Sequence, residues 1–381
     1  MRILFTFAGG SGHADPLIPF ADSALAAGHA VAFAGRASAM GRVRGRGFTV
    51  FGGEVPTADT PPTITPLLEL DPEREDRDLR EGFAERLARG RAATVLALCD
   101  RWSPDVIVCD EVDFGSMIAA ERVGIPHATV LVIAAGSFIR ATVVADSLDE
   151  VRAEHGLPPE PELGMPSRHL VLSPFPPSFR DPAFPLPATA RSFRPPALDR
   201  GREAVPDWLS GLPDRPTVYF TLGTVFNLES GGPFARVLAG LHNLPITLVV
   251  TVGREIDPEL FGPQPSNVRI EPYVPQSVLL PRCDAVVSHG GSGTVIGTLA
   301  AGLPSVALPM GADQPLNAAR CAALGVGLTL DAVRATPDAV GEAVLAVLTD
   351  PGYRKAAEGV RDEIAALPHV SAAVPLLEAL A

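Results

Sequence analysis

The sequence has little of what marks several protein classes. Its 381 residues include only four cysteines, with no CxxC pair, so neither a disulfide framework nor a zinc site is indicated. The longest uncharged apolar run, at about residues 128–139, is shorter than the roughly 20 residues of a membrane-spanning helix. The chain starts directly in a strand pattern, without the charged region, apolar core and cleavage site of a secretory signal. We therefore expect a cytoplasmic protein with no membrane span.

Positive charge is also scarce. The chain has 31 Lys and Arg residues against 44 Asp and Glu, a net charge of −13, and Lys355 is its single lysine. This balance disfavours a surface that gathers nucleic acid or anionic lipid. Apolar residues make up 46% of the chain and charged residues 20%, which is typical of a globular protein, and the length suggests two domains.

Short apolar runs typical of buried strands alternate with Ala- and Leu-rich helical stretches. This order predicts parallel sheets with helices on both faces, a doubly wound α/β architecture. The expected strands are 3–7, 31–34, 106–109, 129–133, 218–221, 246–251, 285–288 and 305–308.

Proline interrupts this alternation near the middle of the chain. Residues 158–196 contain 12 prolines, which predicts a semi-rigid irregular connection. We therefore place an N-terminal domain at 1–197, a linker at 198–214 and a C-terminal domain at 215–381. A charge-dense stretch of mixed sign at 69–91 is interpreted as a solvated helix, with a lid over a site as the alternative.

The first candidate site follows the first expected strand, where ILFTFAGGSGH leads into a helical run near Pro16. Glycines there permit close approach of a ligand, and doubly wound sheets bind ligands at the carboxyl ends of their strands. Gly10 and Gly12 lack the third glycine of a dinucleotide fingerprint, because Asp15 stands in its place. The segment therefore predicts either a ligand-binding loop or a structural turn.

His13 in this segment is a candidate general base, because a neutral imidazole accepts a hydroxyl proton near pH 7. Asp110 ends another expected strand, and the two side chains would meet at one sheet edge if the strands are neighbours. The carboxylate would then orient the imidazole and stabilise its protonated form. Helix N-capping is the alternative role for Asp110. A serine hydrolase is disfavoured, since both GGSG segments miss the GxSxG pattern.

The second candidate site is DAVVSHGGSGTVIGTLAAGLP at 284–304. A strand ends near His289, glycines with Ser292 and Thr294 follow, and an Ala-rich helix begins. The amides at such a helix start bind phosphate without many cationic side chains. The segment lacks the GK[ST] of a P-loop, and no DxD-like pair offers carboxylates to a metal. We therefore expect a diphosphate site that needs no metal.

Two neighbouring segments extend this second site. Asp313 and Gln314 follow a short strand and offer the acceptors and donors that sugar hydroxyls need, with turn formation as the alternative. Upstream, EPYVPQ at 271–276 places Tyr273 beside a Val-Pro turn, which suits stacking on a flat ring.

Together these segments resemble the GT-B glycosyltransferases, and specifically the family of bacterial natural-product and plant small-molecule glycosyltransferases. The resemblance spans the whole chain and is densest from Tyr273 to Leu330, where YVPQ, HGGSGT, AAGLP and ADQPLNA occur in the family's order and spacing. It implies two Rossmann-like domains facing each other across a cleft. The first would bind the acceptor and the second the nucleotide sugar, and the last helix can cross back to the first domain.

The resemblance also implies roles for individual residues. His13 matches the base that deprotonates the acceptor hydroxyl, and Asp110 matches its orienting carboxylate. The other matching positions would hold the nucleobase, the diphosphate and the sugar of the donor. These expected donor-binding residues are Gly12, Thr224, Tyr273, Val274, His289, Gly290, Gly291, Ser292, Gly293, Thr294, Asp313 and Gln314.

One position departs from the family pattern. Members that use UDP-sugars often carry a Glu eight residues after the motif His, where it binds the ribose hydroxyls, and this chain has Gly297 there. We therefore expect a dTDP-deoxysugar rather than a UDP-sugar, with inverting transfer to a hydroxyl of a lipophilic natural-product aglycone. The aglycone would contact loops near residues 56–90 and 134–180. Because the chain begins at its first strand, without the extra helix of members that need an auxiliary protein, we expect activity without a helper.

Other functions stay open at this stage. A non-hydrolysing sugar-nucleotide epimerase shares the architecture and the diphosphate site, but needs several carboxylates around one sugar. An NAD(P)-dependent oxidoreductase is disfavoured by the broken glycine fingerprint. A non-catalytic nucleotide-sugar-binding module would need neither His13 nor Asp110.

Overall fold

The computed structural model describes residues 1–52, 65–195, 205–223, 228 and 231–381. The chain divides into two compact units. Of the described residues, the first unit contains 1–52, 71–195 and 367–381, and the second contains the remainder. The backbone therefore passes between the units several times.

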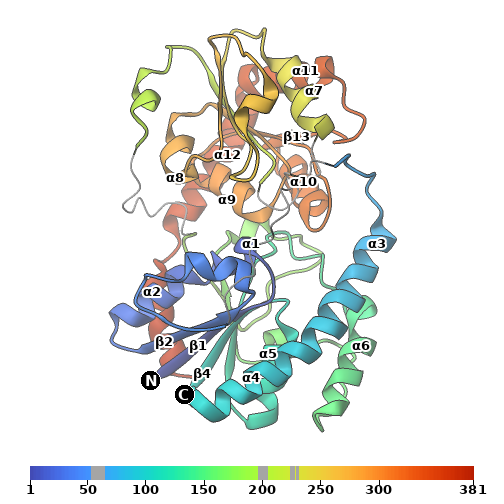
Figure 1. Ribbon diagram of the computed structural model, residues 1–381, viewed down its shortest axis with the longest axis vertical. Helices are drawn as coiled ribbons and strands as arrows, with labels where there is room; N and C mark the ends of the chain where they lie inside the picture. The colour runs from blue at the N-terminus through green and yellow to red at the C-terminus, as the bar shows by residue number, and fades with distance from the viewer. Residues whose placement is uncertain (53–64, 196–204, 224–227, 229–230) are drawn as a thin grey trace. The chain divides into compact units, whose positions relative to one another are not determined.

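The first unit is built on a parallel sheet of seven strands, in the order β3-β2-β1-β4-β5-β6-β7 (Figure 1). Because neighbouring strands run in the same direction, their carboxyl ends lie along one edge of the sheet, where ligands bind in such folds. The strands are β1 (Arg2–Phe7), β2 (Ala30–Gly35), β3 (Thr49–Phe51), β4 (Val106–Asp110), β5 (His127–Val130), β6 (Leu170–Ser173) and β7 (Ala190–Ser192).

Helices cover both faces of this sheet, and alternate residues of β1 point to opposite faces. Leu4 belongs to a buried cluster with Leu98 of α4, whereas Phe5 belongs to a cluster with Phe20 of α2. A π-helical stretch, Asp78–Leu87, joins α3 to α4. The helices are α1 (Ser11–Ala14), α2 (Ile18–Ala26), α3 (Pro72–Arg77), α4 (Ala88–Trp102), α5 (Phe114–Val123), α6 (Ala141–Glu154) and α13 (Val374–Glu378), and the 3₁₀ turns are Ala37–Arg42, Met165–Ser167, Pro177–Phe179 and Val370–Ala373.

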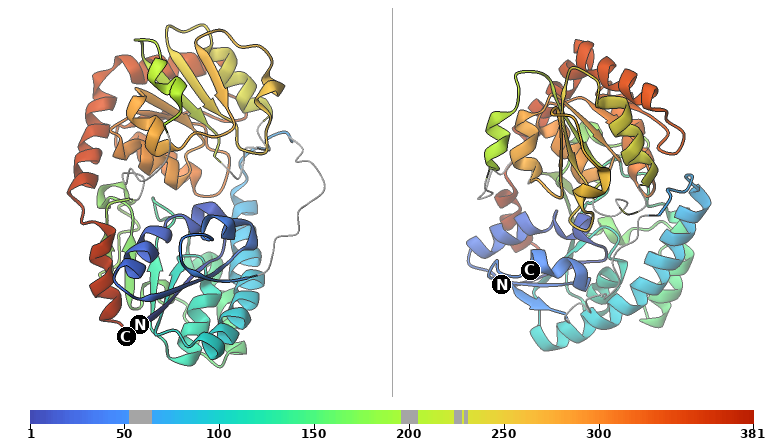
Figure 2. Two further views of the ribbon diagram at one scale, coloured as in Figure 1. Left: turned by 60° about the vertical axis from the view of Figure 1, so that its left-hand side comes forward. Right: turned by 45° about the horizontal axis from the view of Figure 1, so that its top comes forward.

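The two ends of the chain meet in this first unit. His29 Nε2 lies 3.0 Å from Glu378 Oε1, and Figure 2 shows the termini side by side in both views. Val370 and Leu377 join the same apolar core as Phe20. The last fifteen residues, Leu367–Ala381, are therefore part of the first unit's core.

The second unit has a parallel sheet of six strands, in the order β10-β9-β8-β11-β12-β13. Its inner strands are apolar on both faces, as expected for a sheet covered by helices on each side. The strands are β8 (Thr217–Thr221), β9 (Thr247–Thr251), β10 (Val268–Glu271), β11 (Ala285–Ser288), β12 (Ser305–Ala307) and β13 (Gly327–Thr329). The helices are α7 (Gly231–Leu241), α8 (Gln276–Leu279), α9 (Ser292–Ala300), α10 (Gln314–Ala323), α11 (Pro337–Thr349) and α12 (Pro351–Ala366), and the 3₁₀ turns are Asp207–Gly211, Pro258–Phe261 and Leu280–Arg282.

The structure confirms the doubly wound α/β prediction, and each of the eight expected strands overlaps an observed one. The proline-rich segment 158–196 was wrongly predicted to be irregular throughout, because β6 and β7 both form within it. Their residues contain no proline and lie between prolines, so the ladder loses no donor. Residues 131–133 also differ from the prediction, since they leave the sheet after β5.

One predicted domain boundary differs in the structure: residues 65–70, expected in the N-terminal domain, belong to the second unit. Leu367–Ala381 belong to the first unit, in line with the expectation that the last helix can cross back to the first domain. Of the expected linker 198–214, residues 198–204 lie outside the described residues, and Asp207–Gly211 form a 3₁₀ turn of the second unit. In the part of the chain that is described, no helix is long and apolar enough to cross a membrane.

Candidate active site

His13 and Asp110 lie together at the carboxyl edge of the first sheet. His13 is on α1, just after β1, and Asp110 is the last residue of β4, which pairs with β1. Their Nδ1 and Oδ2 atoms are 3.3 Å apart, and the side chain of His13 is 25% exposed whereas that of Asp110 is fully buried. The expected meeting of the two side chains at one sheet edge is therefore confirmed.

Asp110 is held in place by backbone amides. Ala8 N donates to Oδ2 at 2.7 Å, and Val112 N donates to Oδ1 at 2.8 Å. The alternative role of helix N-cap belongs instead to Asp113, whose side chain accepts from Ser116 N at the start of α5. The two amides thus hold Asp110 Oδ2 3.3 Å from His13 Nδ1, an arrangement in which a carboxylate can orient an imidazole so that Nε2 accepts a proton.

Two neighbours that the sequence did not single out pack against the His13 ring. Phe83 stacks on it, with ring centroids 6.2 Å apart and planes inclined by 21°. A Cβ added at Gly9 would lie 2.1 Å from His13 Cδ2 and 2.4 Å from Nε2, so a side chain there would displace the imidazole. Phe83 lies in the charge-dense stretch 69–91, which is a helix from Pro72 onward but is not simply solvated. In the sequence, the one feature that could have indicated this contact is an aromatic side chain within a charged run.

Glu111, next to Asp110, organises a neighbouring loop at the same edge. Its Oε1 accepts from Val132 N and Ile133 N, each at 2.5 Å, in the segment that leaves the sheet after β5. Burial raises the pKa of Glu111 to about 7, although the Arg180 guanidinium and the two amides favour the ionised form. The adjacent carboxylates of Asp110 and Glu111 therefore serve different partners, His13 for Asp110 and the loop backbone for Glu111.

The second unit places His289 directly after β11, at the carboxyl edge of its sheet. The residue is 9% exposed, and burial lowers the pKa of its imidazole to about 4. A Cβ at Gly223 would lie 2.6 Å from its Cε1, and one at Gly291 would lie 2.4 Å from its Nε2. His289 is therefore neutral near pH 7 and can act as a hydrogen-bonding group but not as a cation.

A hydrogen-bond network ties the glycine loop after His289 to the start of α10. Asn317 is fully buried, and its Nδ2 lies 2.9 Å from Gly290 O, 3.1 Å from Ser292 Oγ and 2.8 Å from Asp313 Oδ2. Ser292 Oγ also donates to Asp313 Oδ2 at 2.6 Å. One carboxylate oxygen of Asp313, Oδ2, therefore accepts hydrogen bonds from within the unit. Asn317 is the central residue of this network, and the sequence assigned it no site role.

Gln314 and Thr294 are also engaged within the second unit. Gln314 is 3% exposed, and its Oε1 accepts from Met310 N at 2.8 Å. Thr294 Oγ1 accepts from Gln276 Nε2 at 3.3 Å. The structure brings Gly290, Gly291, Ser292, Gly293 and Thr294 together as the loop and first turn that lead into α9. The start of α9 thus has the backbone arrangement that binds anions in other proteins.

Tyr273 is 37% exposed after β10, and the guanidinium of Arg254 lies 4.0 Å from its ring centroid. The ring thus already has one cationic stacking partner. Val274 is 2% exposed and packs in the core with Leu279, so only its backbone is available to a ligand.

The remaining expected residues are less informative. Gly12 lies on α1 and Gly293 on α9, each with open space where a Cβ would point. Thr224 lies outside the described residues. Among the residues that are described, no group of three His, Cys, Asp or Glu side chains could hold a metal ion.

The chemistry that this arrangement offers is an oriented imidazole in the first unit and an amide-rich, uncharged loop in the second. The first can accept a proton, and the second can bind an anion. Ser292 donates to Asp313 rather than to a base, so the glycine loop of the second unit does not present a hydrolase nucleophile.

The sequence is similar to a known family and to several characterised enzymes. The family described as "Erythromycin biosynthesis protein CIII-like, C-terminal domain" matches residues 235–380. Tylactone mycaminosyltransferase of Streptomyces fradiae is 30% identical, over 100% of this chain and 92% of that protein. 10-deoxymethynolide desosaminyltransferase of Streptomyces venezuelae is also 30% identical, over 100% of this chain and 97% of that protein.

Solved structures agree with these relatives. The spinosyn rhamnosyltransferase SpnG superposes with a TM-score of 0.80 at 26% identity, over 99% of this chain and 100% of that one. Glycosyltransferase SnogD from Streptomyces nogalater gives a TM-score of 0.77 at 27% identity, over 100% of this chain and 99% of that one. This chain is an enzyme that belongs to the natural-product glycosyltransferases of the GT-B fold.

Proposed function

We propose that this enzyme transfers a deoxysugar from a dTDP-sugar to a hydroxyl group of a lipophilic natural-product aglycone, with inversion at the anomeric carbon and without a metal. The observation that carries the proposal is the pair formed by His13 and Asp110, because a carboxylate-oriented imidazole is what removes a proton from an alcohol near pH 7. Family membership favours this reaction over the epimerase and oxidoreductase alternatives.

The proposed reaction begins at His13 Nε2, since Nδ1 is the ring nitrogen that lies 3.3 Å from Asp110 Oδ2. Nε2 takes the hydroxyl proton, the acceptor oxygen forms a bond to the anomeric carbon, and the bond from that carbon to the diphosphate oxygen breaks. Asp110 stabilises the imidazolium, and the electron pair leaves with the nucleoside diphosphate. Backbone N–H groups from Gly291 to Thr294, assisted by neutral His289, stabilise the growing charge on the diphosphate, while Gly290 N donates to Ser288 Oγ.

The remaining donor contacts follow from the same assignment. Tyr273 and the backbone of Val274 would hold the nucleobase, and Thr224 and Gly12 would complete the diphosphate site. Asp313 and Gln314 would bind the sugar hydroxyls, for which a carboxylate and an amide are suitable partners.

Two observations support a thymidine rather than a uridine nucleotide. Gly297, a buried residue of α9, provides no carboxylate for ribose hydroxyls. Among solved structures that this chain resembles, VinC is described in complex with dTDP and SpnG with thymidine diphosphate. A structure of SpnG with the spinosyn aglycone, and relatives named for tylactone and 10-deoxymethynolide, support a lipophilic acceptor.

A panel of dTDP- and UDP-sugars, followed by thermal shift, tests the donor, because a ligand that binds the folded state raises its melting temperature. We expect dTDP-sugars to stabilise the enzyme more than UDP-sugars, and the reverse order would remove the Gly297 argument. Incubation with tylactone, 10-deoxymethynolide or spinosyn aglycone should give a glycoside whose anomeric configuration is opposite to that of the donor. An epimerised sugar nucleotide formed from donor alone would favour the epimerase instead.

A further inference from the structure

A segment from the N-terminal half of the sequence crosses the carboxyl edge of the second sheet. Thr65 N donates to Leu228 O at 2.7 Å, in the connection that follows β8, and Glu69 Oε1 pairs with Arg334 Nη2 at 2.6 Å, in the connection that follows β13. In the strand order, β11 and β12 lie between β8 and β13. Residues 65–70 therefore extend along this edge from the connection after β8 to the connection after β13.

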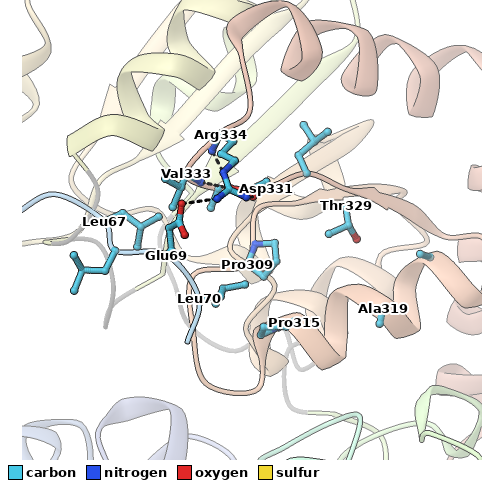
Figure 3. Close-up of a pocket in the computed structure, with 14 residues that line it drawn as sticks. Leu67, Glu69, Leu70, Pro309, Pro315, Ala319, Thr329, Asp331, Val333 and Arg334 are labelled. Atoms are coloured by element: carbon cyan, nitrogen blue, oxygen red, sulfur yellow. Dashed lines mark hydrogen bonds and ion pairs between the residues drawn. The ribbon is translucent and has the colours of Figure 1, made fainter. Parts of the chain in front are cut away.

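A cavity of about 630 Å³ lies beneath this segment (Figure 3). Its walls come from residues 67–70, from Pro309 after β12, from one face of α10, and from residues 329–334 at the end of β13. This volume is within the roughly 300–1,000 Å³ of small-molecule pockets. Pro309 and Pro315 both line the cavity, and Asp313 and Gln314 lie between these two prolines in the sequence.

The lining of the cavity is mainly apolar. Leu68 is 62% exposed and Leu70 is 42% exposed, while Leu67 packs against the core of the second unit. The charged groups at the cavity already bind one another: Arg334 pairs with Glu69 and, at 3.7 Å, with Asp331. Two carboxylates against one guanidinium would repel a diphosphate, so the cavity suits a neutral, apolar molecule.

The helix α10 separates this cavity from the donor network. Pro315, Ala319 and Ala322 lie on its cavity-lining face, since residues four and seven positions apart share a side of a helix. Asn317 and Cys321 lie on the buried face, and Asn317 bonds to Gly290 and Asp313. A molecule in the cavity would therefore lie one helix width from the proposed sugar site.

We propose that this cavity binds the apolar body of the acceptor, so that Leu67–Leu70 and α10 form an acceptor-binding wall on the donor-binding unit. The proposal rests on the proposed function, and it moves part of aglycone recognition away from the loops of the first unit. Leu68 and Leu70, now exposed, would be covered by the bound aglycone, which gives the apolar contact a favourable free energy.

Filling the cavity tests the proposal. Ala319 is exposed on the cavity side of α10, so Ala319→Phe places a ring in the cavity without entering the core. We expect the KM for an aglycone to rise about tenfold or more, with the KM for the dTDP-sugar within about twofold. The matched control is Ala239→Phe on α7, also exposed in the second unit but outside the cavity lining, and it should leave both KM values unchanged. An unchanged aglycone KM in Ala319→Phe would overturn the proposal.

A binding measurement separates this proposal from the proposed function. The four native cysteines are buried, so Ala319→Cys and Ala239→Cys each introduce one reactive thiol. Tylactone, 10-deoxymethynolide and spinosyn aglycone are added in turn, and the rate of N-ethylmaleimide labelling is measured. An aglycone that is glycosylated should slow labelling at position 319 about fivefold or more and leave position 239 unaffected. Glycosylation without protection overturns the acceptor wall alone, whereas neither glycosylation nor protection by any aglycone overturns both proposals.

Discussion

The two units each place a histidine at the carboxyl edge of a parallel sheet, and the environments of the two side chains differ. His13 is partly exposed and lies 3.3 Å from a buried carboxylate that two amides hold in place. His289 is buried, has glycines on two sides, and has a pKa lowered by burial to about 4. The first environment stabilises a protonated imidazole, and the second excludes one.

Position in the sequence alone therefore does not determine the chemical role of a histidine. Both residues follow a strand and stand beside glycines, so the motifs GGSGH and HGGSG look alike in composition. The neighbouring strand decides their roles: β4 ends in Asp110 beside His13, whereas β8 ends in Thr221 beside the strand that precedes His289. This contrast supports the proposed division, in which the first unit transfers the proton and the second binds the anion.

Replacement of His13 should have the largest effect. We expect His13→Ala to lower kcat for transfer by about 10²–10⁴-fold, the usual contribution of a general base, while the affinity for dTDP changes less than about twofold. Initial rates at saturating donor and aglycone, with calorimetry of dTDP binding, measure the two effects. His155→Ala, at the end of α6, is the control. Turnover of His13→Ala at the wild-type rate would remove the assignment of the base.

Replacement of His289 should mainly affect dTDP affinity, whereas replacement of His13 should mainly affect kcat. We expect His289→Ala to weaken dTDP binding about 10- to 100-fold, because a hydrogen bond to a charged group contributes roughly 1.5–3 kcal/mol. The rate at saturating donor should change less than the affinity. The terminal phosphate of dTDP itself titrates at about pH 6, so the pH dependence of dTDP affinity is compared between wild type and His289→Ala. The two profiles should run parallel from pH 6 to pH 8, since the pKa of His289 is about 4. His242→Ala, just after α7, is the control, and a pH dependence in this range that His289→Ala abolishes would contradict a neutral His289.

A methyl group next to His13 tests how strictly its ring must be placed. Gly9→Ala puts a Cβ 2.4 Å from Nε2, so the imidazole must move, whereas at Gly10 a Cβ meets nothing within 4 Å. We expect kcat to fall about tenfold in Gly9→Ala, because small displacements of a base cost much of its effect. Gly10→Ala should retain wild-type kcat and melting temperature. Equal activity of both variants would mean that the position of His13 is not critical.

Much of the site could be predicted from sequence, because motifs at the ends of strands define it. The strand order needed for His13 to meet Asp110 was conditional, since it depends on which strands pair, and β1 does pair with β4. The same kind of reasoning could not find Phe83 beside His13, because its run of charged neighbours indicates a solvated helix. This contact depends on packing between segments that are far apart in the sequence, so the local sequence pattern does not predict it.

Contacts over long sequence separations account for the remaining differences. Glu69 and Arg334 are 265 residues apart, so neither local propensity nor spacing links residues 65–70 to the second unit. The carboxylate of Asp313 was expected to bind a sugar, yet Ser292 and Asn317 already bond to one of its oxygens. A motif shows which polar groups are present, and only the tertiary structure shows which of their lone pairs remain available.

A third histidine, His127, is buried like His289 but lies outside the proposed site. His127 begins β5, at the amino end of the strand, and its Nε2 lies 2.9 Å from Met165 O. Burial lowers the pKa of His127 to about 4, as at His289, but no substrate is expected at this edge. His127→Gln keeps a side-chain N–H group for Met165 O, so it should alter the pH dependence of stability and leave kcat and dTDP affinity unchanged.

The sign of that pH dependence follows from the two states of His127. In the unfolded chain its pKa is about 6.5, so below that pH the unfolded state binds a proton that the folded state does not bind until about pH 4. The free energy of unfolding therefore falls as pH falls, by about 1 kcal/mol between pH 6.5 and pH 5.5 for this one group. Glu111 and His289 titrate in wild type and variant alike, so the difference between them isolates His127. Urea unfolding at both pH values should show His127→Gln losing about 1 kcal/mol less than wild type. An equal loss would mean that the folded state accommodates a charged imidazole at the amino end of β5.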